Sequence, residues 1–317
     1  MPENHTSPTL AVIQDMAAAY TGLVFGPVKI GYSLATFLFG FGTAQTYIYY
    51  RDFADDPLPI KLLVAVVWAA DFAHQISLGH CTYWYLVRFF GVPAGLFNKA
   101  PQSVTAIIES STILLFLVPA FFTYRFWRSS KKHIQVGLLA VLIAARLVMT
   151  SLLGGLISRA PSYVISLLRF RSIILFCWIC GAAVDVLLTI ALCYDLHVRQ
   201  RSTMYYRTAR MIDRLKMWCV ATGMATSIVA AVMAVCFCIM DNNIWMGIYF
   251  VLPRLVSNSL LASLNLRRSL RQMDPTGTGD LALQPRHPPP GQHANGISIC
   301  VDVVTEMPVK VMPYTSS

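Results

Sequence analysis

Four charged side chains lie inside long apolar stretches of the sequence. They are two acids and two bases, namely Asp71, Arg146, Asp185 and Arg254. A charge is costly in apolar surroundings, so such residues usually face the interior of a helix bundle, pair with each other and mark functional sites. Two acids and two bases at similar depth could neutralise each other. Two interpretations follow: a structural network that fixes helix packing, or a ligand site, an ion site or a switch.

Depth along the expected helices suggests which of these charges meet. At 1.5 Å per residue from its outer end, Asp185 lies about 22 Å along the fifth span and Arg254 about 15 Å along the seventh. We therefore expect Asp185 and Arg254 to lie near each other, or to share partners with the other two charges. Pro253 is expected to kink the seventh span. The candidate buried polar network comprises Asp71, His74, Arg146, Asp185, Arg254 and Asn258.

Several chemistries lack the residues that they need. A retinal protein requires a lysine inside the last helix for its Schiff base, and the stretch Ile244 to Leu266 contains none. A zinc hydrolase requires at least three converging ligands, but only His74 and His80 lie near the membrane, on different faces of one helix. Cys177 and Cys180 form a C-x-x-C without the second pair that a zinc site needs. We predict no cofactor, no metal site and no catalytic set.

Composition places these residues in a membrane protein. Of the 317 residues, 56% are hydrophobic and 13% are charged, and soluble domains usually carry about a quarter charged residues. A membrane-spanning helix needs about 20 mainly apolar residues, and seven stretches qualify. They run from Gly26 to Tyr50, Ile60 to Tyr83, Val104 to Tyr124, Ile134 to Ile157, Phe170 to Tyr194, Met217 to Met240, and Ile244 to Leu266. The predicted fold is an all-α bundle of seven transmembrane helices.

Basic residues orient the bundle. With the N-terminus outside and the C-terminus in the cytosol, most lysines and arginines between the spans are cytosolic, as the positive-inside rule requires. Their spread between apolar runs explains the net charge of +10 without a nucleic-acid partner. Asn4 begins a glycosylation sequon in the segment expected outside. The expected location is the plasma membrane or another membrane of the secretory pathway.

Four regions follow along the chain. Residues 1–25 form an extracellular segment, 26–266 the bundle, 267–273 a short helix at the interface, and 274–317 a disordered cytosolic tail rich in Pro, Gly, Thr and Gln. In the loop before the sixth span, Arg207, Arg210 and Arg214 share one helical face. This cytosolic basic face is expected to contact anionic lipid headgroups, or alternatively to dock a cytosolic signalling partner.

Several strings of residues resemble one family. The strongest lie in the last third, residues 177–268, where Ile212-Asp213-Arg214-Leu215 is followed by Ser257-Asn258-Ser259-Leu260-Leu261. Earlier strings include Gln45-Thr46-Tyr47 in the first span and Phe122-Thr123-Tyr124-Arg125 at the end of the third. Together they resemble a fungal, basidiomycete-type family of seven-helix membrane proteins known as domain of unknown function 6534. The resemblance implies a fold and a membrane location, and no activity.

The sequence favours a non-enzymatic protein with receptor-like topology, a sensor of an unidentified small ligand. The absence of an acidic-Arg-Tyr triplet after the third span and of Asn-Pro-x-x-Tyr in the seventh argues against the large receptor class. The first alternative is a transporter or channel that uses the buried charges as an ion path, although no inverted repeat is seen. An intramembrane enzyme is the third candidate.

Overall fold

The protein is a bundle of long helices in the computed structural model, which describes residues 8–88, 99–130, 133–202, 206–240 and 242–272. No strand occurs in these ranges. The helices are α1 (Pro8–Asp52), α2 (Leu58–Tyr83), which continues into a π-helical turn η1 (Trp84–Arg88), α3 (Gln102–Ser130), α4 (His133–Arg159), the short α5 (Tyr163–Arg169), α6 (Arg171–Ser202), α7 (Tyr206–Ile239) and α8 (Ile244–Gln272).

Five of these helices are long and apolar enough to cross a membrane within the part of the chain that is described. They span Leu58–Arg88, Gln102–Arg128, His133–Arg159, Arg171–Val198 and Ile244–Arg267. The stretch Gly223–Ile239 of α7 is a shorter apolar helix. Since each long segment satisfies its own backbone hydrogen bonds, these helices indicate an integral membrane protein.

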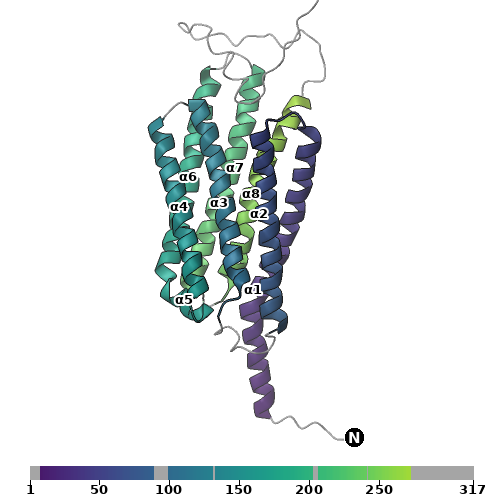
Figure 1. Ribbon diagram of the computed structural model, residues 1–317, viewed down its shortest axis with the longest axis vertical. Coiled ribbons are helices and arrows are strands. Elements are labelled where there is room, and N and C mark those ends of the chain that lie inside the picture. The colour runs from purple at the N-terminus through teal and green to yellow at the C-terminus, as the bar shows by residue number, and fades with distance from the viewer. Residues whose placement is uncertain (1–7, 89–98, 131–132, 203–205, 241, 273–317) are drawn as a thin grey trace, which may run out of the picture.

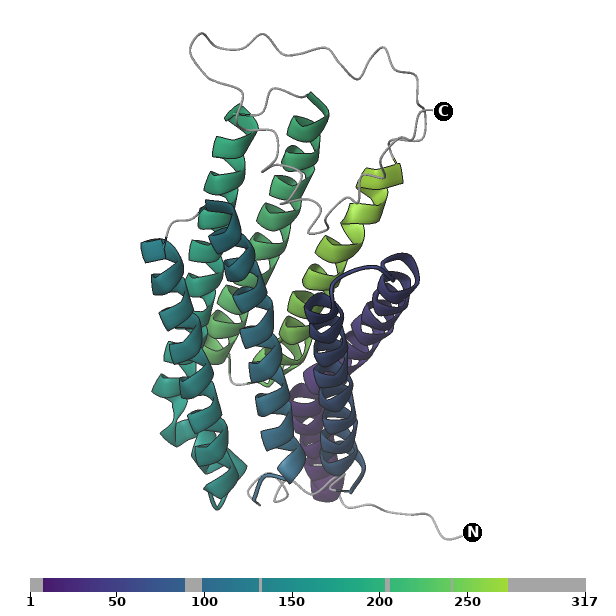
Figure 2. The same cartoon turned by 45° about the horizontal axis from the view of Figure 1, so that its top comes forward.

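The helices stand side by side and close into a ring (Figure 1). Each long helix packs against the next in the order α1, α2, α3, α4, α6, α7 and α8, and α8 returns to pack against α1. Burial differs strongly around this ring. In their apolar windows, 61% of α8 but only 17% of α4 is buried. The two views agree that α8 runs between α7 and the pair α1 and α2 (Figure 2), so α8 is the helix best placed to position a site.

The helix boundaries differ from the predicted ones at both ends of the chain. Helix α1 begins at Pro8 rather than at Gly26, because residues 8–25 include Ala17-Ala18-Ala19 and other strong helix formers. Residues 267–272, expected as a short helix of their own, continue α8 without a break. The tail from residue 274 lies outside the described residues.

Two glycines bring α1 and α8 into backbone contact. A Cβ atom added to Gly31 would lie 2.3 Å from the Cα atom of Gly247, and one added to Gly247 would lie 2.5 Å from the carbonyl oxygen of Pro27. Only residues without a side chain allow two helices to approach this closely. This crossing holds α8 against the first helix near the end of the bundle that carries α5.

Large apolar side chains cover the outside of the bundle. On α4 they include Ile134, Leu138, Val141 and Leu152, all between 60% and 89% exposed. A helix that is apolar all round belongs in a large core or in a membrane. The outward face of α4 has no protein partner among the described residues, which is the pattern expected for contact with lipid.

Candidate functional site: two charge pairs and a cavity

Arg254 of α8 and Asp71 of α2 form a fully buried ion pair. The Nη1 atom of Arg254 donates hydrogen bonds to the Oδ1 atom of Asp71 at 2.7 Å and to its carbonyl oxygen at 2.8 Å. The Nη2 atom donates to the Oε1 atom of Gln75 at 3.1 Å. The side chains of Arg254 and Asp71 are 0% and 4% exposed. A hydrogen bond between an arginine and a carboxylate is charge-assisted and is stronger than a hydrogen bond between two neutral groups.

Neighbouring residues complete this first network. Ser257, three residues after Arg254 and therefore on the same side of α8, donates from its Oγ atom to the Oδ2 atom of Asp71 at 2.7 Å. Gln75 donates in turn to Thr36 of α1 at 2.7 Å. Three helices are thereby joined by polar contacts that satisfy both oxygens of the carboxylate, which is the arrangement of a structural network.

The second pair, Arg146 of α4 and Asp185 of α6, is built differently. The Nη1 atom of Arg146 lies 3.6 Å from the Oδ1 atom of Asp185, too far for a hydrogen bond. The Nη1 atom has no hydrogen-bond partner, although the side chain is only 10% exposed. Gly181 of α6 makes room for the guanidinium, because a Cβ atom there would lie 2.8 Å from the Cζ atom of Arg146. Arg146 is thus buried but poorly satisfied.

The four predicted charges form two pairs, and of the two arrangements that depth suggested the structure shows the one in which Asp185 and Arg254 find partners among the other two charges. Asp185 and Arg254 do not pair with each other; each pairs with one of the other two charges. The position of a residue along its helix determines its depth in the bundle, but it does not determine toward which neighbouring helix the side chain points. Because α4 packs against α6 and α2 packs against α8, the partners are set by the helix order.

The last two residues of the predicted network play separate parts. His74 is fully buried, and neither of its ring nitrogens has a hydrogen-bond partner. Asn258 donates from its Nδ2 atom to the carbonyl oxygen of Leu38 on α1 at 3.0 Å. Its Oδ1 atom would lie 2.9 Å from a Cβ atom at Gly42, so Asn258 fastens α8 to α1 where glycine leaves space.

Sequence reasoning missed Glu109 and a third ion pair. Glu109 of α3 accepts a hydrogen bond at 3.0 Å from Ser151 of α4; the signal was an acid near the start of an apolar run. At the end of the bundle opposite α5, Arg267 lies 2.5 Å from Asp56, whose carboxylate also accepts from the hydroxyl of Tyr49 at 3.0 Å. This cluster ties the end of α8 to the turn between α1 and α2.

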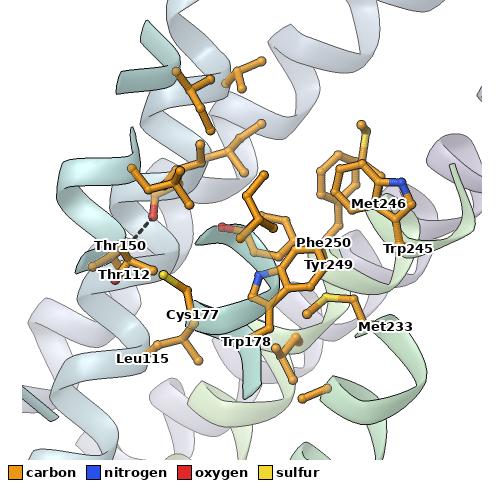
Figure 3. A pocket seen from close by; sticks show the side chains of 18 of the residues that line it. Thr112, Leu115, Thr150, Cys177, Trp178, Met233, Trp245, Met246, Tyr249 and Phe250 are labelled. Atoms are coloured by element: carbon orange, nitrogen blue, oxygen red, sulfur yellow. Dashed lines mark hydrogen bonds between the residues drawn. The ribbon is translucent and has the colours of Figure 1, made fainter. Parts of the chain in front are cut away.

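A cavity lies in the half of the bundle nearer α5. Its volume is about 120 Å³, and an apolar cavity of about 150 Å³ can hold a molecule the size of benzene. Most of its wall is aliphatic or aromatic, and Figure 3 shows Trp178, Tyr249 and Phe250 gathered opposite Thr112 and Thr150. Arg146 and Asp185 are the charged residues of the wall. An apolar pocket with a few polar groups is typical of a small-molecule site.

A smaller cavity of about 50 Å³ lies between α3, α6, α7 and α8. Thr189, Thr226 and Ser259 give its wall a more polar character, and Asp185 also lines it. Asp185 therefore belongs to the walls of both cavities.

The remaining predicted residues lie beyond the described side chains. Arg207, Arg210 and Arg214 fall in the first turns of α7, but the directions of their side chains lie outside the description. Asn4 precedes the described residues. Among the residues that are described, no group of three His, Cys, Asp or Glu side chains is placed to hold a metal ion.

The chain resembles known proteins over one region. Residues 181–269 match a family described as a family of unknown function, DUF6534. The matched region runs from the middle of α6 to the end of α8 and contains Gly181, Asp185, Arg254 and Asn258. No curated protein and no solved structure matches the chain.

Proposed function

We propose that this membrane protein is a non-enzymatic, receptor-like sensor that binds a small, mainly apolar molecule in the cavity between its helices. In the proposed topology, seven spans cross the bilayer, with the N-terminus outside and the C-terminus in the cytosol. The whole chain, and not only residues 181–269, would belong to the fungal seven-helix group that it resembles. In this orientation the cavity lies in the outer half of the bilayer, and the basic residues of α7 meet anionic lipid or a signalling partner in the cytosol.

The cavity is the observation that supports this proposal. Its volume of about 120 Å³ approaches the roughly 150 Å³ of an apolar cavity that holds benzene. It is lined mainly by apolar and aromatic side chains, and it lies within a bundle whose outer surface is itself apolar. A molecule that reaches the cavity from the bilayer must be apolar over most of its length. Helix α8 supplies Trp245, Tyr249 and Phe250 to the wall and is the most buried span, so it is the element that a bound molecule would push.

The sharpest test uses the tryptophans of the cavity as reporters. Two of the six tryptophans, Trp178 and Trp245, line it. The full chain in lipid nanodiscs would be titrated with ω-bromohexanol, a neutral apolar probe whose bromine quenches tryptophan emission on contact. Binding to a site gives quenching that saturates with probe concentration, whereas dissolution in the bilayer gives quenching that rises in proportion. We expect a saturable component.

Three variants locate the saturable component. Ala182 lines the cavity, and Ala182→Leu should fill it and remove the saturation; Ala140→Leu on the exposed side of α4 is the matched control and should leave it intact. Replacing Trp178 and Trp245 together by Phe should remove the saturable signal and leave the proportional one. Purely proportional quenching in the unaltered chain, or saturation that survives Ala182→Leu, would overturn the proposal.

A transporter is the second candidate, and the position of Asp185 favours it. A carboxylate that lines two cavities and belongs to a buried ion pair is the kind of group that a proton or cation path uses. In liposomes that contain the full chain and a pH-sensitive dye, this alternative predicts proton flux that Asp185→Asn abolishes. A sensor predicts no flux in either protein.

A further inference from the structure

The two buried arginines differ in how well the protein satisfies them. The guanidinium of Arg254 donates three hydrogen bonds to α2. A guanidinium carries five N–H donors and no acceptor. The buried Nη1 atom of Arg146 has no hydrogen-bond partner among the described residues and lies 3.6 Å from the Oδ1 atom of Asp185. Burying a charged donor without acceptors is strongly unfavourable. Arg146 is therefore a buried cation that still requires an acceptor.

A second donor lies on the wall of the same cavity. Trp178 lines it, and its indole N–H can only donate. It precedes Gly181, against which the guanidinium rests, by three residues, so the two positions share one face of α6 and differ in height by about 4.5 Å. Cys177 lies within electrostatic reach of Arg146 as well, which places the guanidinium beside this turn of the helix.

The hydroxyl groups of the wall point to the same kind of ligand. Thr112 donates to the carbonyl oxygen of Ile108 at 2.8 Å, and Thr150 donates to that of Arg146. Their protons are engaged, which leaves the guanidinium of Arg146 and the indole N–H groups of Trp178 and Trp245 among the remaining donors of the wall. A ligand that satisfies them must present acceptors, and a carboxylate matches the fork of an arginine with two oxygens.

We propose that the cavity selects small apolar carboxylates, with the carboxylate held by Arg146 and the apolar chain lying along Trp178, Tyr249 and Phe250. This specificity rests on the proposed function, because it assumes that the cavity binds a small molecule at all. Asp185 lies 3.6 Å from the guanidinium, and the carboxylate of the ligand would supply the acceptor that the Nη1 atom lacks. Arg146 is thus the residue that determines specificity, while Arg254 only joins helices.

Three probes with one tail and one quencher separate the head groups. The full chain in nanodiscs would be titrated at pH 7 with ω-bromohexanoate, ω-bromohexanol and ω-bromohexylamine, and the saturable tryptophan quenching measured for each. A carboxylate has a pKa near 4 and is ionised at this pH. A charge-assisted hydrogen bond should make the carboxylate bind about ten- to a hundred-fold more tightly than the alcohol, and the amine more weakly than either.

Variants assign the preference to Arg146. Arg146→Gln should reduce carboxylate affinity to that of the alcohol and leave the alcohol unchanged. The single change leaves Asp185 unpaired and could prevent folding. The double variant Arg146→Gln with Asp185→Asn keeps the site neutral, and it should lose the preference for the carboxylate in the same way. Arg51→Gln at an exposed pair is the control and should change neither affinity.

The two proposals fail in different ways. If the alcohol and the carboxylate both saturate with equal affinity, or if the preference survives both variants at position 146, then the guanidinium is satisfied by water and the carboxylate specificity is wrong, while the binding function stands. If no probe gives saturable quenching, the binding function itself is overturned.

Discussion

The guanidinium carbon of Arg146 lies 2.8 Å from the point where a side chain at Gly181 would begin. Real Cβ contacts are longer, so any larger residue at this position of α6 must push the arginine aside. The displaced group is the end of a flexible side chain, and it can move without moving the backbone. Gly181 therefore determines the position of the Arg146 guanidinium, and a substitution at Gly181 can displace this guanidinium without removing it.

We predict that Gly181→Ala reduces the preference for the carboxylate probe over the alcohol by about ten-fold, since a displaced guanidinium loses its charge-assisted contacts, while the midpoint of thermal unfolding stays nearly unchanged. The measurement is the pair of tryptophan-quenching titrations. Gly155→Ala on α4, where a Cβ would meet nothing within 4 Å, should leave both affinities as they are. An unchanged preference in Gly181→Ala would remove the role given to Arg146.

The Arg254–Asp71 pair should carry stability. Arg254→Gln or Asp71→Asn should each lower the free energy of unfolding by about 3–5 kcal/mol, because each leaves an uncompensated buried charge. The double variant should lose clearly less than the sum. Chemical unfolding in mixed micelles gives all three values. As the comparison, Asp185→Asn combined with Arg254→Gln should be additive, since these residues belong to separate pairs; coupling there would contradict the assignment.

The glycine crossing of α1 and α8 should tolerate no side chain. Gly31→Ala places its Cβ atom 2.3 Å from the backbone of Gly247, and backbone cannot move as a side-chain end does. We expect a loss of about 1–3 kcal/mol in the free energy of unfolding. Gly40→Ala on the same helix meets nothing within 4 Å and should be neutral or slightly stabilising, since alanine favours a helix by about 1 kcal/mol over glycine. Equal effects would show that the helices do not touch at Gly31.

His74 should be dispensable for stability. Both ring nitrogens are buried without partners, and an unsatisfied buried polar group costs about 1–3 kcal/mol. His74→Leu should therefore leave the free energy of unfolding unchanged or raise it. Asn258→Leu is the contrasting variant and should destabilise, because it removes the hydrogen bond to Leu38 and adds bulk beside Gly42. A large loss in His74→Leu would mean that the ring makes a contact of its own.

The sequence predicted the long helices and the buried charges better than it predicted contacts between them. Runs of about 20 apolar residues can satisfy their backbone groups only as helices, and each of the seven runs coincides, to within one residue at its ends, with part of α1, α2, α3, α4, α6, α7 or α8. The charged residues were visible because each interrupts such a run. Their partners were not, since the pairing of Asp71 with Arg254 depends on which helices are neighbours, and a single sequence does not order the helices.

The cavity could not be predicted from the sequence. Its wall combines residues from both ends of the chain, from Phe25 of α1 to Leu252 of α8, and most of them are, taken alone, ordinary apolar members of their helices. Gly181 gave no local signal either, because its importance comes from Arg146, a residue on another helix. Arg146 and Asp185 were the members of the wall with a visible signal, since each is a charge in an apolar run.

Pro253 divides α8 into two parts with different attachments. Before it, Trp245 and Tyr249 face the cavity; after it, Arg254 and Ser257 are fixed to α2. Proline cannot donate to the carbonyl of the residue four positions earlier, so the hydrogen-bond ladder is interrupted at the boundary between the two parts. The segment of α8 after Pro253 is therefore fixed to α2, while the segment before it lines the cavity. A ligand that enters or leaves the cavity would change the bend of α8 at Pro253 rather than shift the whole helix along its axis.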